Sequence, residues 1–170
     1  MTEASHVGDL VTRLALSHPE VSFRFINNGQ VKLHTSGNGN LKDVIYHIYG
    51  REIASNLIEV DFERKGIHIT GYLGKPLISR GNRNFENYFV DGRYIKSSII
   101  SKAIEDGYKD FTMQHKYPFV VLYLDVDTEH VDVNVHPTKM EMRFQRQQDV
   151  YNIVYEGVHR TLLEPELIPQ

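Results

Sequence analysis

The spacing of apolar residues along the chain predicts a series of helices. Over residues 3–17 apolar side chains recur every three or four positions, so we expect a helix that buries Val7, Leu10, Val11, Leu14 and Ala15. The same spacing predicts further helices over residues 41–49, 98–108 and from about 147 into the 160s. Asn40 and one of Ser97 and Ser98 precede two of them, where a side-chain oxygen can accept a free backbone N–H.

Alternation of apolar and polar residues predicts strands between these helices, several of them joined by tight turns. We expect strands over residues 21–26, 31–35, 57–63, 67–72, 85–90, 93–95, 118–126 and 131–135. The dipeptides Asn28-Gly29 and Asp91-Gly92 favour hairpin turns, because both residue types accept positive φ. Strands and helices mix without regular βαβ alternation, which predicts an α+β fold with helices on one face of a mixed sheet.

Composition is typical of a globular domain. Of 170 residues, 41% are hydrophobic and 24% charged, and no apolar run reaches the length of a membrane span. The polar N-terminus, with Glu3 and Asp9, is not a signal peptide. Cysteine is absent, which excludes disulfides, thiolate nucleophiles and cysteine zinc sites and fits a cytoplasmic protein. We therefore expect one domain over residues 1–165 and a tail over 166–170.

Charge is unevenly distributed. Residues 75–116 carry eight Lys and Arg against five Asp and Glu, whereas residues 117–170 carry four against nine. A basic middle segment can contact phosphate, although this excess is mild beside that of dedicated nucleic-acid binders. An ordinary solvated surface is the alternative interpretation.

Motifs of catalysis are absent from the sequence. It contains no GxxxxGKS/T phosphate loop, no GxGxxG after a strand and no HExxH helix. The nine histidines are scattered, without HxH or HxxxH spacing, so we predict no metal site. No nucleophile elbow is present either, so we predict no complete set of catalytic residues in this chain. A Ser-His-Asp arrangement stays open at this point, because its members come together only in the fold.

The segment from Val131 to Phe144, VDVNVHPTKMEMRF, is the most distinctive part of the sequence. An alternating strand runs into Pro137, which fixes its own φ and biases His136 toward an extended conformation. Such a turn can present Lys139 beyond the end of a sheet, where its ammonium is a compact donor for a terminal phosphate. By spacing alone, a solvated loop lysine is the simpler interpretation.

These residues resemble the NVHPxK signature that closes the ATP-binding head of MutL-type DNA mismatch-repair proteins. Other segments resemble the same family, and together the similarity covers nearly the whole chain. They are Leu14–Pro19, Thr35–Gly39, Ile48–Gly50, Arg83–Phe85 and Phe89–Arg93.

The resemblance implies the second of two parts of that head. The first part is a nucleotide-binding domain of the GHKL class, whose catalytic Glu beside a Mg-binding Asn, DxGxG loop and GFRGEAL lid are missing from this chain. The second part has the ribosomal-protein-S5 domain 2-like fold, an α/β sandwich with a left-handed βαβ crossover. We therefore expect a piece of a longer protein that is not an enzyme on its own, with ATP and Mg²⁺ as cofactors only of the whole protein.

The resemblance also assigns residues and partners. It places Lys139 on the γ-phosphate of ATP, positioned by Asn134, His136, Pro137 and Thr138. In this family the head dimerises on ATP around a basic groove that binds DNA without sequence readout, and the candidates here are Arg80, Arg83, Arg93, Lys96 and Lys102. Further implied partners are the upstream GHKL domain and the mismatch-recognition protein MutS, without a membrane, in the bacterial cytoplasm or nucleoid.

Two other functions fit parts of the sequence. A stand-alone nucleic-acid-binding module of the same fold needs a stronger basic excess than this chain shows. The equivalent domain of a type II topoisomerase-like ATPase carries its lysine in a different local motif, so the NVHPTK string argues against it.

Overall fold

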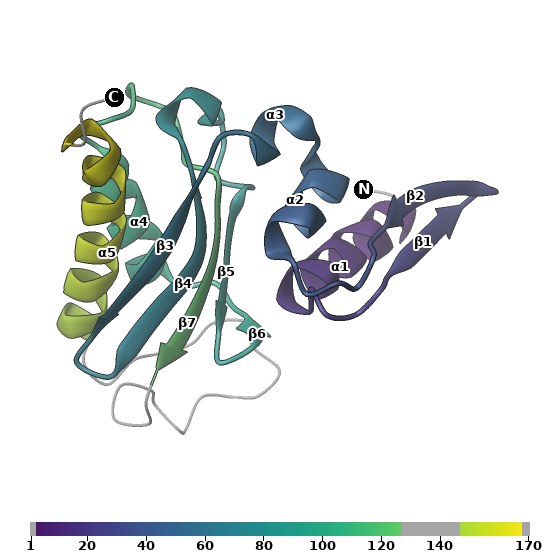
Figure 1. Ribbon diagram of the computed structural model, residues 1–170, viewed down its shortest axis with the longest axis horizontal. Helices are drawn as coiled ribbons and strands as arrows, with labels where there is room; N and C mark the ends of the chain where they lie inside the picture. Colours follow the sequence, from purple (N-terminus) through teal and green to yellow (C-terminus); the bar gives the residue numbers. More distant parts are fainter. Residues whose placement is uncertain (1–2, 127–146, 168–170) are drawn as a thin grey trace. The chain divides into compact units, whose positions relative to one another are not determined.

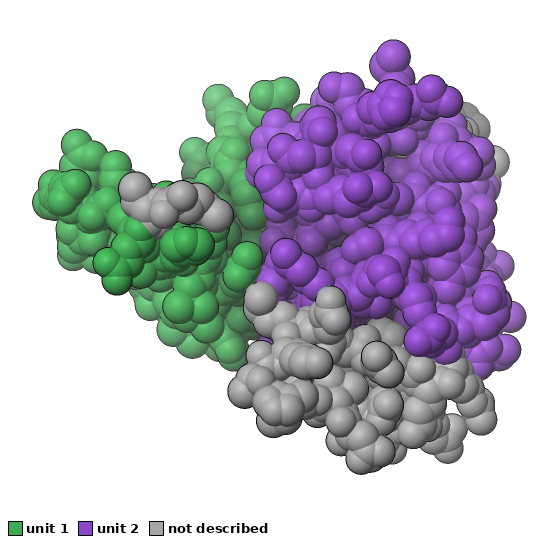
Figure 2. Space-filling view, turned by 180° about the vertical axis from the view of Figure 1, so that it is seen from behind, with its two compact units in different colours: residues 1–56 green, residues 57–170 purple. Residues whose placement is uncertain are grey.

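The computed structural model describes residues 3–126 and 147–167, which fall into two compact units, residues 1–56 and 57–170. Figure 2 colours the two units separately, and each is described here by itself. The proposed division into one domain over 1–165 and a short tail stays a prediction. The strand expected over 131–135 lies outside the described residues.

The first unit combines helices with one hairpin. Its elements are α1 (Glu3–Ser17), β1 (Arg24–Asn27), β2 (Gln30–His34), α2 (Leu41–Tyr49) and α3 (Arg51–Ala54). The antiparallel strands β1 and β2 are joined by Asn28 and Gly29, whose φ angles of 52° and 76° form the predicted turn. The side chain of Asn40 accepts a hydrogen bond from the backbone N–H of Asp43 at 3.2 Å, which confirms Asn40 as the N-cap of α2.

The buried face predicted for α1 is wrong in part. Ala15 and its neighbour Leu16 are buried, but Val7, Leu10 and Leu14 are 42%, 55% and 39% exposed. Helical spacing defines an apolar stripe without saying which element covers it, and within this unit α1 packs chiefly on α2 and β1. The short helix α3 differs from the prediction that the helical region ends at Gly50: α2 ends there, and α3 begins at the next residue.

The second unit is built on a five-stranded mixed sheet. Its strands are β3 (Leu57–Arg64), β4 (Ile67–Gly74), β5 (Glu86–Val90), β6 (Arg93–Tyr94) and β7 (Val120–Val126), in the order β3-β4-β7-β5-β6. Among the strands of the described residues, only β5 and β7 pair in parallel. A short 3-10 helix, η1 (Pro76–Ile78), follows β4.

Two helices, α4 (Ser98–Tyr108) and α5 (Gln147–Leu167), cover one face of this sheet, as Figure 1 shows. Apolar residues at alternate positions of the strands form the sheet side of the core. All five apolar residues predicted for the last helix are buried in the same core: Val150, Ile153, Val154, Val158 and Leu162. The two helices approach closely at Gly107, where a Cβ atom would lie 2.7 Å from Val158 Cγ1. The predicted α+β class, with helices on one face of a mixed sheet, is confirmed.

The chain passes from β5 through β6 and α4 to the parallel neighbour β7, which is a βαβ crossover. Its hand stays a prediction. Helix α5 runs to Leu167, two residues past Pro165, where a frayed tail was expected. Proline has no backbone N–H to donate to the carbonyl four residues earlier, so the helix continues through Pro165 without that hydrogen bond.

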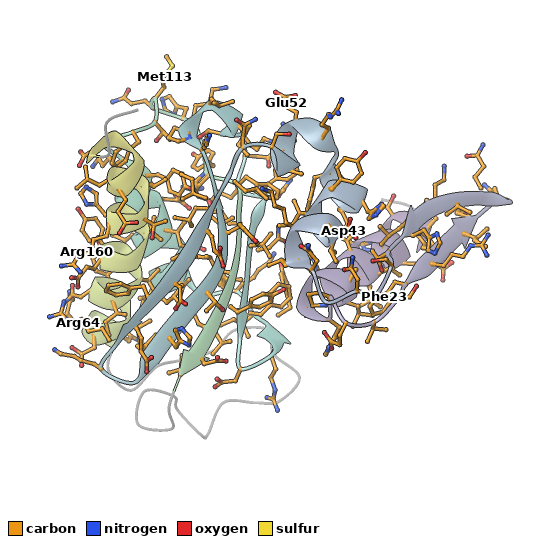
Figure 3. The ribbon with its side chains drawn as sticks, viewed as in Figure 1. Phe23, Asp43, Glu52, Arg64, Met113 and Arg160 are labelled. Atoms are coloured by element: carbon orange, nitrogen blue, oxygen red, sulfur yellow. The ribbon has the colours of Figure 1, made fainter. Side chains whose placement is uncertain are left out.

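At the outer edge of the sheet α5 is tied to β3 by charged residues. Glu156 accepts from Arg64 of β3 and lies 3.4 Å from Arg160, and the Arg160 guanidinium lies 6.0 Å from the ring centre of Phe62. Arg64 and Arg160 both extend along this edge beside α5 (Figure 3). These contacts are exposed in part and add little to the stability that the buried core provides.

Candidate functional site

The residues assigned to the nucleotide lie outside the described part of the chain. This holds for Lys139 and for Asn134, His136, Pro137 and Thr138, which were expected to position it. The candidates whose surroundings the structure describes are the five basic residues of the middle segment.

Arg80 lies in the loop before β5 and is held by main chain and side chain. Its backbone N–H donates to Tyr117 O and its carbonyl accepts from Tyr117 N, both at 2.7 Å. Its guanidinium carbon lies 4.6 Å from the ring centre of Phe85, a cation–π contact. The Nε atom is buried and has no hydrogen-bond partner among the described residues.

Arg83 is held on two sides. Its Nε donates to both carboxylate oxygens of Glu105, at 3.1 and 3.0 Å, and its guanidinium carbon lies 4.5 Å from the ring centre of Tyr117. The hydrogen bond to Glu105 raises the pKa of Arg83, so the guanidinium stays charged. The side chain is nevertheless 63% exposed.

Glu86, the first residue of β5, lies buried next to this pair. Burial first, and then the nearby Glu105, raise the pKa of its carboxyl to about 9, while the positive charge of Arg83 opposes the shift. Neither carboxyl oxygen of Glu86 has a hydrogen-bond partner at normal distance among the described residues, so the loss of solvation dominates. At neutral pH the group is therefore uncharged, and Arg83 faces one carboxylate rather than two.

The other three candidates lie elsewhere in the second unit. Arg93 follows the turn of Asp91 and Gly92, whose φ angles of 48° and 83° match the predicted hairpin, and Lys96 lies between β6 and α4. Both are exposed. Lys102 is on α4, 3.3 Å from Asp106. Because β5 separates Arg83 from Arg93, the five residues form no single cluster.

Sequence reasoning missed the residues that surround the two arginines. Phe85, Glu105 and Tyr117 come from a loop, a helix and a second loop, and no spacing rule connects them. Glu86 offered one signal, since it shares the inward face of its strand with Tyr88 and Val90.

Four histidines in the described residues each lie within 4 Å of a single carboxylate. Examples are His68 with Asp61 at 2.7 Å and His159 with Asp110 at 3.3 Å. The hydrogen bond to Asp61 raises the pKa of His68. In residues 3–126 and 147–167 no group of three or more potential ligands is placed to hold a metal ion.

A hollow beyond the end of α4 contains none of the predicted residues. It is lined by Pro76, Asp110, Phe111, His159 and Leu163. On α5 the rings of Tyr151, Tyr155 and His159 stack in succession toward it, with centroid distances of 6.2 and 5.5 Å.

Comparison with known proteins gives the class to which this fold and sequence belong. Residues 45–163 match the family described as DNA mismatch repair protein, C-terminal domain. The fold and this match together define a DNA mismatch-repair domain. The chain is also 57% identical over 169 residues to the DNA mismatch repair protein MutL of Agathobacter rectalis. It belongs to the MutL family of DNA mismatch-repair proteins.

That match covers 99% of this chain but 26% of the relative, so the chain spans about a quarter of the curated relative's length. Two solved structures, each 21% identical, share the fold. One, described as the N-terminal domain of a DNA repair protein, gives a TM-score of 0.78 and covers 96% of this chain and 54% of its own. The other, a MutL ATPase domain from Aquifex aeolicus, gives 0.61 and covers 92% and 51%. The predicted S5 domain 2-like fold is confirmed.

No helix in the described ranges is both long enough and apolar enough to cross a membrane.

Proposed function

We propose that this chain is the transducer part of a MutL-type mismatch-repair ATPase head. The single observation that carries the proposal is the family match over residues 45–163, which includes the whole NVHPTK string. The coverage of the solved structures agrees with it, because this chain corresponds to about half of each of those heads. The family match also favours mismatch repair over a topoisomerase or a stand-alone nucleic-acid-binding module.

In this proposal the neighbouring GHKL domain holds ATP with Mg²⁺, and Lys139 supplies a cation to the γ-phosphate. A cation that contacts only this phosphate stabilises the ATP-bound arrangement and loses its partner after hydrolysis. Asn134, His136, Pro137 and Thr138 hold the backbone that presents Lys139. Charge-assisted contacts of this type contribute about 1.5–3 kcal/mol.

The test is Lys139→Ala in the whole protein. We expect steady-state ATP turnover to fall by roughly tenfold or more, in line with the loss of one charge-assisted contact. Thermal unfolding should stay unchanged, since the substitution removes a charged group and no large apolar side chain. The matched control is Lys116→Ala, which removes one charge from an exposed loop position. Unchanged turnover in Lys139→Ala would refute the assignment.

The second element of the proposal is DNA binding without sequence readout, through basic residues that contact the phosphodiester backbone. Support comes from the exposed guanidinium of Arg83 and the exposed positions of Arg93, Lys96 and Lys102. In the whole protein we further propose ATP-dependent dimerisation and a functional partnership with the mismatch-recognition protein MutS, both from membership of the family.

A further inference from the structure

Two of the basic residues differ from the others in how they are held. Arg80 and Arg83 each lie with the guanidinium against an aromatic ring, at 4.6 Å from the centre of Phe85 and 4.5 Å from that of Tyr117. A planar guanidinium stacked on a ring loses much of its rotational freedom before any ligand arrives. Preorganisation of this kind lowers the entropic cost of binding.

The loop that carries the two arginines is itself fixed at both ends. The bridge between Arg80 and Tyr117 joins its start to the segment before β7, and Phe85 O accepts from Val120 N at 3.0 Å at its end. Between them, Asn82 Oδ1 accepts from the backbone N–H of Asn84 at 2.9 Å. The main chain therefore holds both arginines at a set spacing beside β5.

The terminal nitrogens of these side chains remain available. The contacts of Arg83 with Glu105 use Nε, and neither terminal nitrogen of Arg80 or Arg83 donates to an acceptor among the described residues. Two terminal N–H groups of a guanidinium match two oxygens of one phosphate. Glu105 offsets one of the two positive charges, and the uncharged Glu86 offsets none, so the loop keeps a net positive charge at neutral pH.

We propose that Arg80 and Arg83 form a preorganised clamp for adjacent phosphates of the DNA backbone, with Phe85 and Tyr117 as positioning residues. The clamp rests on the DNA-binding role proposed above and narrows it to one end of β5.

The first test asks whether DNA binding depends on Arg80 and Arg83 in particular or on positive charge at any exposed position. In the whole protein, binding of a labelled DNA duplex of arbitrary sequence is measured by fluorescence anisotropy over a range of salt concentrations. For Arg80→Gln with Arg83→Gln we expect the affinity to fall about tenfold or more and the slope of log affinity against log salt to decrease by about two. The matched control, Lys109→Gln with Lys116→Gln, removes the same charge from two exposed positions outside the proposed binding residues and should change the slope by less than about one.

The second test keeps both positive charges and removes the planar guanidinium groups that contact the aromatic rings. Arg80→Lys with Arg83→Lys preserves both positive charges but abolishes the planar stacking and the paired donors, and we expect a loss of affinity of about fivefold. Arg51→Lys, at an exposed position of α3 outside the proposed binding residues, is the control and should bind as the wild type does. Because the Nε atom of Arg80 is buried, unfolding curves are measured for each variant to show whether the fold is retained.

The outcomes distinguish the two levels of the proposal. If the wild-type protein does not bind the duplex at any salt concentration, the DNA-binding role fails and the clamp fails with it. If it binds but the two double glutamine variants lose equal affinity, or the double lysine variant binds normally, only the clamp is overturned. The clamp is supported if the double glutamine and the double lysine variants of Arg80 and Arg83 both lose DNA affinity while their control variants do not.

Discussion

At the scale of single residues, the carboxyl of Glu86 shows how a buried acid can favour an anion site nearby. It belongs to the apolar face of β5, where burial raises its pKa to about 9. A second ionised carboxylate beside Glu105 would cancel the remaining positive charge of the arginine loop. Protonation of Glu86 avoids this second negative charge, but it makes the free energy of unfolding depend on pH.

The direction of that dependence follows from proton linkage. The unfolded chain releases this proton near the ordinary value of 4.5, whereas the folded chain keeps it until about pH 9. The stability that the protonated carboxyl contributes is complete below about pH 4.5 and is lost as the pH rises toward 9. Glutamine keeps the shape and has no proton to lose.

We therefore predict that Glu86→Gln stabilises the protein at neutral pH by roughly 1–3 kcal/mol and increasingly so up to about pH 9. Urea unfolding at several pH values measures the effect. Glu59→Gln, at an exposed position of β3, serves as the control. A difference between wild type and Glu86→Gln that stays constant from pH 5 to pH 9 would contradict the assignment of a buried, protonated carboxyl.

At the scale of elements, the close approach of α4 and α5 depends on one glycine. A Cβ atom at Gly107 would meet Val158 Cγ1 at 2.7 Å and Val158 Cβ at 3.0 Å. Both helices cover the same sheet, so neither can move away without opening the core beneath it.

Gly107→Ala should therefore destabilise the fold by about 1–3 kcal/mol, although alanine favours a helix over glycine by about 1 kcal/mol. Gly8→Ala in α1 is the contrasting variant, since its Cβ would lie 3.4 Å from Phe25 and needs no displacement. That substitution should be neutral or slightly stabilising. Chemical denaturation of each variant gives the comparison.

A double variant tests the cause. Combining Gly107→Ala with Val158→Ala makes room for the added methyl group, so the two changes together should cost less than the sum of their separate effects. Strict additivity would show that the contact between the two helices is not the source of the loss.

At the scale of the whole molecule, the proposed function makes this chain one part of a larger ATPase. It spans about a quarter of its curated MutL relative and carries none of the GHKL motifs for nucleotide binding. We predict that the isolated chain neither binds nor hydrolyses ATP. The measurement is steady-state phosphate release by purified chain, with the whole protein as the positive control. Turnover by the chain above the level of contaminants would refute this prediction.

Local patterns in the sequence determined most of the secondary structure. The two Asn-Gly and Asp-Gly turns adopt positive φ, and Asn40 and Ser97 cap their helices as expected. These features depend on interactions between residues only a few positions apart, which spacing and residue type describe directly. The apolar stripe of α5 also follows from local spacing, whereas its burial depends on the sheet that covers it. The string NVHPTK, which predicted the family, is likewise local.

Only the tertiary structure decided which surfaces are covered and which side chains meet. Helical spacing identified the apolar stripe of α1 but could not show that Val7, Leu10 and Leu14 remain exposed. The basic residues of the middle segment were predicted as one group, yet β5 separates Arg83 from Arg93. The partners of Arg83, Glu105 and Tyr117, lie 22 and 34 positions further along the chain. Contacts over such separations depend on how the sheet and helices pack, which residue spacing along a single segment does not encode.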